Sequence, residues 1–218
     1  MLKYTSAKLD VTVMAYNIDP NFFASRAGLF GKFPNFYDIN TKRGNGIKSS
    51  REDMPESIEF YGLNAPPDVI SLTSQNWALS EGLRAIFDEF ASANREVHYI
   101  PLKLKFVKSN VQPIQYFFVD MVPDACRVLP DKSRYQKITY PDRHFFSLIG
   151  GDGSVVMRKS RPGDPHIWRE QRHQTIEGQS YGHSELKWVV SDELWTAISE
   201  NYSKCFSHYY IEEIEAAA

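Results

Sequence analysis

Apolar and polar residues alternate in several stretches of the chain, and this period of two predicts β-strands. Leu9, Val11 and Val13 alternate with polar neighbours, so residues 9–16 are expected to form a strand with one buried face. Residues 97–106 have the same period, whereas residues 114–122 are apolar on both faces, which is typical of a strand buried on both sides. We expect these last two segments to be neighbouring strands of one sheet.

Two other stretches have the 3.6-residue period of amphipathic helices. Each begins with a serine, Ser80 or Ser191, that can accept the free amide hydrogens of a first helical turn. Carboxylates follow each serine and favour the positive end of the helix dipole. The pattern predicts helices over 80–93 and 191–203, with apolar stripes made of Leu83, Ile86, Phe87 and Phe90 in the first and Leu194, Trp195, Ile198 and Tyr202 in the second.

The second half of the chain contains three further strand signals. Gly150-Gly151-Asp152-Gly153 separates the apolar segments 143–149 and 154–157, and a tight turn of this composition predicts a β-hairpin. Residues 187–190 form a short apolar run that leads directly into the second helix, and residues 206–214 are expected to add a last strand. The fold class that follows is α+β, with a mostly antiparallel sheet.

The N-terminal 60 residues are less regular. After residue 16 the periodicity is lost, and the polar run 41–56 contains basic residues beside Gly44 and Gly46, so we expect a mobile loop there. A basic loop near aromatic residues could bind single-stranded nucleic acid, but a solvated surface loop is the more common meaning of this composition. No Pro-, Gly- or Ser-rich linker divides the chain, which favours one domain over 1–218.

Composition excludes several classes of protein. The chain has 218 residues, is 42% hydrophobic and carries a formal net charge of −2, so it can build a core but has no overall positive field to attract nucleic acid. No stretch contains the roughly 20 apolar residues that cross a bilayer, and the start does not have the form of a secretory signal. Two cysteines far apart, Cys126 and Cys205, are expected to be reduced thiols of a cytoplasmic protein.

Motifs of known chemistry are missing from the sequence. The glycine cluster near residue 150 lacks the Gly-Lys-Ser/Thr of a phosphate-binding loop, and the six histidines include no i, i+4 pair of the kind that holds zinc. Ser191 lies at a predicted strand-to-helix turn but lacks the Gly-x-Ser-x-Gly of a nucleophile elbow. We therefore predict no catalytic, metal-binding or cofactor-binding residue, and no cofactor.

Three stretches carry a resemblance to a family: residues 79–84 at the first helix, His166-Ile167-Trp168-Arg169, and residues 188–194 at the second helix. In this order, from about residue 66 to 200, they resemble bacterial immunity proteins of polymorphic toxin systems. Trp168 departs from the more usual Phe, the tail after Tyr202 lacks a common Gly, and residues 1–60 match nothing recognised.

The resemblance implies a non-enzymatic inhibitor that binds one cognate secreted toxin domain. A small hydrolase or transferase stays open as the alternative, and a scaffold or effector-associated interaction domain as a third. An immunity protein needs a dissociation constant of about a nanomolar and a buried area of about 1,600 Å². Residues 160–185 are rich in aromatic and charged residues, so we expect part of the binding surface there, made of Arg161, His166, Trp168, Arg169, Glu170 and Arg172. The sequence does not indicate the oligomeric state.

Overall fold

The computed structural model confirms an α+β fold. It describes residues 15–20, 29–30, 35–60, 67–73, 76–91, 97–107, 112–121, 125, 127–141, 144–148, 155–170, 173–176, 178–182 and 188–214. The helices are α1 (Phe36–Gly44), the 3-10 helix η2 (Arg51–Asp53), α2 (Glu81–Ala91) and α3 (Asp192–Tyr202). The described strands form three sheets, of six, five and four strands.

The six-stranded sheet has the order β2-β3-β6-β7-β5-β4. Its strands are β2 (Leu29–Phe30), β3 (Ser57–Phe60), β4 (Val69–Thr73), β5 (Asn76–Ser80), β6 (Val97–Phe106) and β7 (Ile114–Met121). All pairs are antiparallel except β3 with β6. The expected pairing of the two long strands is confirmed, because β6 runs antiparallel to β7 with Ile100 opposite Phe118. Both faces of this sheet are covered, which accounts for the continuous apolar run of β7.

The five-stranded sheet has the order β10-β15-β1-β14-β11. It consists of β1 (Ala15–Pro20), β10 (Val156–Arg158), β11 (Ile167–Trp168), β14 (Trp188–Ser191) and β15 (Phe206–Ile214). The expected strand before the second helix and the expected last strand are both confirmed. The strand expected over 9–16 lies mostly outside the described residues, and β1 extends beyond it to Pro20.

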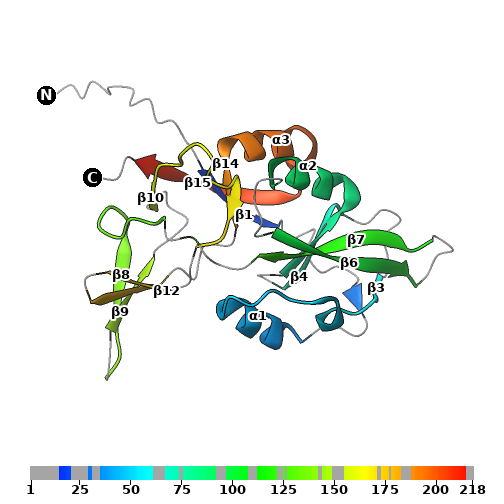
Figure 1. Ribbon diagram of the computed structural model, residues 1–218, viewed down its shortest axis with the longest axis horizontal. Coiled ribbons are helices and arrows are strands. Elements are labelled where there is room, and N and C mark those ends of the chain that lie inside the picture. The colour runs from blue at the N-terminus through cyan, green and yellow to red at the C-terminus, as the bar shows by residue number, and fades with distance from the viewer. Residues whose placement is uncertain are drawn as a thin grey trace, which may run out of the picture.

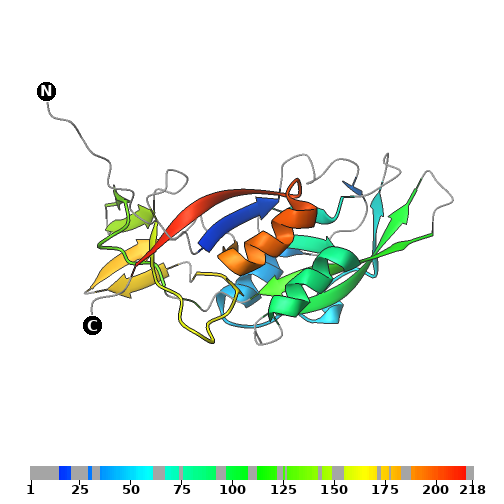
Figure 2. The ribbon, with the colours of Figure 1, turned by 90° about the horizontal axis from the view of Figure 1, so that it is seen from above.

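Helices α2 and α3 lie side by side and cover the inner faces of both large sheets (Figures 1 and 2). Both predicted serine caps are confirmed: Ser80 Oγ accepts from the Leu83 amide at 3.3 Å and Ser191 Oγ accepts from the Leu194 amide at 3.3 Å. In the core beneath them, the indole of Trp77 from β5 lies 3.9 Å from that of Trp188 from β14, measured between ring centres. This contact joins the two sheets.

Helix α1 covers the opposite face of the six-stranded sheet (Figure 1). The prediction that residues 41–56 form a loop is wrong for part of that run, since 41–44 are the end of α1 and 51–53 form η2. Polar composition misled the prediction because Arg43, on the inner side of α1, is only 2% exposed and pairs with a buried carboxylate.

The four-stranded sheet lies at one end of the molecule, away from the six-stranded sheet (Figure 1). Its order is β12-β13-β9-β8, made of β8 (Tyr135–Thr139), β9 (His144–Leu148), β12 (His173–Ile176) and β13 (Gln179–Gly182). The predicted hairpin around residue 150 is wrong. Strand β9 pairs with β8 and β13, whereas β10 runs parallel to β15 in another sheet. The glycines of the expected turn lie outside the described residues.

Candidate functional site

A cavity of about 360 Å³ opens between the loop at residues 160–166 and the first turn of α3. This volume falls within the range of ligand-binding sites, roughly 300–1,000 Å³. Its walls come from three parts of the chain that are distant in sequence: the loop, the start of α3 and strand β15. The lining residues are Ser160, Arg161, Pro162, Gly163, Asp164, Pro165, His166, Ser191, Glu193 and Glu213.

Arg127 fixes the loop from beneath. Its Nη1 donates to Ser160 Oγ at 3.0 Å, and its Nη2 lies 2.9 Å from Asp164 Oδ2. The same guanidinium lies 4.4 Å from the ring centre of Trp168, a cation–π contact. Arg127 is itself buried, so these bonds fix the position of the loop relative to the five-stranded sheet.

The loop also closes on itself. The Arg161 amide donates to Asp164 Oδ2 at 2.8 Å, and the Asp164 amide donates to the Arg161 carbonyl at 3.0 Å. Gly163 has a φ of +88°, a conformation that residues with a side chain rarely adopt. The turn is therefore preorganised before any partner arrives.

Carboxylates dominate the chemistry of the cavity. Glu213 is only 9% exposed and accepts from the Ser160 amide at 3.1 Å and from Ser160 Oγ at 2.8 Å. Glu193 lies in the first turn of α3, and its side chain is 68% exposed. Asp164 is the third carboxylate, and it is already paired with Arg127. One acid is thus buried in the wall and another is free to meet solvent.

His166 contacts the start of α3 without forming a catalytic relay. Its Nδ1 lies 2.8 Å from Ser191 Oγ and 3.8 Å from Glu193 Oε2. A serine–histidine–carboxylate triad requires the serine and the acid on different ring nitrogens, but here both face Nδ1. Ser191 Oγ also caps the helix. The arrangement ties the loop to α3, and the Ser191 amide reinforces it by donating to the His166 carbonyl at 2.8 Å.

The structure places only some of the predicted binding residues at the surface. Arg161 is exposed and His166 is partly exposed, and both line the cavity. The expectation that Trp168, Arg169 and Glu170 are surface residues is wrong, because they are 0%, 8% and 6% exposed. Arg172 lies outside the described residues.

The burial of these residues follows from the pairing of β11. Ile167 lies opposite Val190 and Trp168 opposite Val189 of β14, so their side chains point to opposite faces of the sheet. Ile167 enters the apolar core that contains Trp77 and Trp188, whereas Trp168 enters a second apolar cluster with Val128 and Met157. Glu170 accepts from Trp168 Nε1 at 3.0 Å and from the Arg127 amide at 2.8 Å. Burial raises the pKa of Glu170, and these hydrogen bonds oppose that rise.

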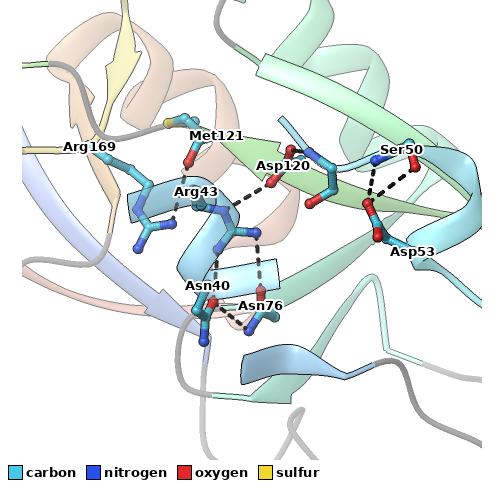
Figure 3. A network of polar contacts seen from close by, with 9 residues as sticks. Asn40, Arg43, Ser50, Asp53, Asn76, Asp120, Met121 and Arg169 are labelled. Atoms are coloured by element: carbon cyan, nitrogen blue, oxygen red, sulfur yellow. Dashed lines mark hydrogen bonds and ion pairs between the residues drawn. The ribbon is translucent and has the colours of Figure 1, made fainter. Parts of the chain in front are cut away.

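A second polar network lies inside the molecule beneath α1 (Figure 3). Arg43 Nε donates to Asp120 Oδ1 at 2.9 Å and Arg43 Nη2 donates to Asn76 Oδ1 at 3.1 Å. The Ser49 amide donates to the other oxygen of Asp120. Sequence reasoning missed this network, although one signal was present: Asp120 is a charged residue in the otherwise apolar end of β7, and a buried charge requires a partner.

Arg169 brings a second cation to this network. Its Nη1 donates to the Met121 carbonyl at 3.5 Å, and Figure 3 shows its guanidinium beside that of Arg43. Burial lowers the pKa of Arg169 to about 9, with further lowering from the charge of Arg43 and an opposing effect from Asp120. The network is structural, since it connects α1 to β7 and to the residue that follows β11.

No helix in the described part of the chain is both long and apolar enough to cross a membrane. No three His, Cys, Asp or Glu side chains among the described residues come together in a way that could hold a metal ion.

Comparison with known proteins identifies the family. The model of the immunity protein family Imm11 matches residues 14–180, about three quarters of the chain. The match begins inside the N-terminal region that sequence inspection left unmatched, and it ends before α3, whose capped start contributed to the resemblance. No curated protein matches the chain. The chain therefore belongs to the Imm11 family of immunity proteins.

Proposed function

We propose that this protein binds and neutralises one cognate secreted toxin domain, in the cytoplasm of the cell that makes both. Membership of an immunity protein family carries this proposal. Neutralisation is expected to occur by binding alone, with a dissociation constant of about a nanomolar or tighter.

The binding surface is proposed to include the cavity and its rim. The loop is held by Arg127, by its own internal hydrogen bonds and by the start of α3, so little conformational entropy is lost when a partner docks there. Arg161 and His166 are the sequence-predicted residues that reach this surface. Trp168, Arg169 and Glu170 are proposed to support it from below, because their side chains are buried.

The alternative of a small hydrolase or transferase finds its best candidate in the contact of His166 with Ser191. The geometry disfavours it, because the carboxylate and the hydroxyl share one nitrogen and the hydroxyl caps a helix. Binding without a reaction is therefore the function we propose.

Growth rescue tests the proposed function. The toxin encoded next to this protein is expressed from an inducible promoter in a bacterial host, alone or with this chain. We expect growth only when both are present. Growth arrest despite soluble expression of the parent chain would contradict the proposal.

A further inference from the structure

The cavity beside α3 contains a buried carboxylate with neutral partners. Glu213 is 9% exposed and its hydrogen bonds come from Ser160, through the amide and the hydroxyl. Among the described residues, no lysine, arginine or histidine forms an ion pair with it. Ionised acids in protein interiors are stabilised by cations or metals, so this wall of the cavity offers a place for a positive charge.

The carboxylates of the lining differ in how far a nearby cation compensates their charge. Arg127 Nη2 lies 2.9 Å from Asp164 Oδ2, and Arg127 reaches Glu213 only through the Ser160 hydroxyl. Among the described residues, Glu213 in the wall and Glu193 at the α3 side therefore have no arginine or lysine in direct contact. The contact of Glu193 with His166 is long, at 3.8 Å, and its side chain is 68% exposed. Arg161 is the one arginine among the lining residues, and it is exposed to solvent. The cavity therefore combines a deep acid with a shallow one.

We propose that this cavity receives a basic side chain, a lysine or an arginine, that projects from the toxin. The occupant fits the site in three respects: a volume of about 360 Å³ admits a long side chain, Glu213 meets its charge in the wall, and Glu193 attracts it at the entrance. The inference rests on the proposed function, because it names the chemistry of the partner at the same surface.

The two acids have different roles in this recognition. A charge at the rim of an interface mainly accelerates association, whereas a buried charge pair mainly slows dissociation. Glu193→Gln is therefore expected to lower the association rate and to weaken the salt dependence of binding. Glu213→Gln is expected to raise the dissociation rate of the toxin complex by about tenfold or more.

The first experiment uses small probes with the full chain. N-acetyl-arginine amide and N-acetyl-lysine amide are titrated into the isotope-labelled protein, with N-acetyl-citrulline amide as the uncharged analogue of arginine. We expect chemical shift changes in residues 160–166 and at the start of α3 with the two cations. Equal changes with citrulline, or none with either cation, would overturn the inference. The titration is repeated with a chelator, and dependence of the signal on a metal ion would also overturn it.

The second experiment measures toxin binding by the variants. Glu200→Gln is the matched control, because Glu200 is an exposed acid on the same helix outside the cavity lining. Thermal unfolding by circular dichroism checks that Glu213→Gln folds, and Glu193→Gln carries the test independently because its side chain is exposed. The effects of Glu193→Gln should vanish when one basic residue of the toxin is replaced by alanine, a coupling that a double-mutant cycle detects.

Growth protection separates this inference from the proposed function. If the parent chain protects while Glu193→Gln and Glu213→Gln both bind the toxin as tightly as Glu200→Gln, the cation site is wrong and the immunity function is kept. If the parent chain neither binds the toxin nor protects, the proposed function fails, whatever the small probes show.

Discussion

Arg43 Nε lies 2.9 Å from Asp120 Oδ1, and both side chains are almost completely buried, at 2% and 0% exposure. This ion pair joins α1 to the end of β7, one of the two middle strands of the six-stranded sheet. Asn76 and the Ser49 amide complete the hydrogen bonds of the pair. Such a network fixes the position of α1, because each polar atom has a partner only in one arrangement.

Replacement of the acid in this pair is expected to be severe. Asp120→Asn leaves Arg43 and Arg169 buried without a counter-charge, and loss of one partner of a buried pair typically costs about 3–5 kcal/mol. Urea unfolding measures the change in the free energy of unfolding. Asp131→Asn is the control, since its contact with Lys132 is exposed and is expected to change stability by less than about 0.5 kcal/mol. Equal small effects of the two variants would contradict the structural role of the pair.

Replacement of Arg169 is expected to leave the stability of the protein unchanged or to increase it. Its guanidinium is desolvated, lies beside another cation and has a long hydrogen bond of 3.5 Å to the Met121 carbonyl. Arg169→Met keeps the length of the side chain and removes one of the two cations near Asp120, whose carboxylate keeps Arg43 as its partner. Because no buried charge is left unpaired, we expect the free energy of unfolding to stay the same or to rise by about 1 kcal/mol. Denaturant unfolding at neutral pH is the measurement. A decrease of more than about 2 kcal/mol in the free energy of unfolding would contradict this expectation and show that the charge of Arg169 stabilises the fold.

The local part of the fold could be predicted from the sequence. Ser80 and Ser191 cap their helices by hydrogen bonds that reach only three residues ahead, so a short window of sequence contains the whole signal. Long-range pairing could not be predicted in this way. Val156 pairs with Glu212 in a parallel register, and nothing near residue 156 specifies a partner so distant along the chain.

The candidate site shows the same limit. Charged and aromatic residues at 166–170 were expected on the surface, which is the usual position of arginine and glutamate. Their burial depends on partners far away in sequence: Arg127 stacks on Trp168, and its backbone amide donates to Glu170. Composition cannot reveal such partners. Arg161 and His166 do line a cavity, and their part in binding stays a prediction.

Glu170 makes the stability of the protein depend on pH. Burial raises its pKa in the folded state above the ordinary value of 4.5. The folded protein therefore binds more protons than the unfolded chain between 4.5 and the raised pKa, and the stabilisation present below pH 4.5 is lost as the pH rises through this window. We expect the free energy of unfolding of the parent protein, relative to Glu170→Gln, to fall as the pH rises from 4.5. Urea titrations at several pH values measure this, and a relative stability that rises with pH would contradict it.

Gly82 and Tyr202 are expected to be coupled between α2 and α3. A Cβ at position 82 would lie 2.7 Å from the Tyr202 hydroxyl oxygen, but 3.9 Å from the ring carbon that carries it. Alanine is favoured over glycine in helices by about 0.8–1 kcal/mol. Gly82→Ala should therefore gain little or lose stability in the parent chain, and should gain up to about 1 kcal/mol in a Tyr202→Phe background. Four thermal unfolding curves complete the cycle, and equal effects of Gly82→Ala in both backgrounds would exclude the coupling.

The most direct test of the immunity function is the affinity of the purified full chain for the toxin domain encoded beside it, measured by calorimetry together with residual toxin activity. The predicted result is a complex with a dissociation constant of about a nanomolar or below, in which toxin activity is lost at equimolar ratio. Absence of a complex at micromolar concentrations, with toxin activity undiminished, would contradict it.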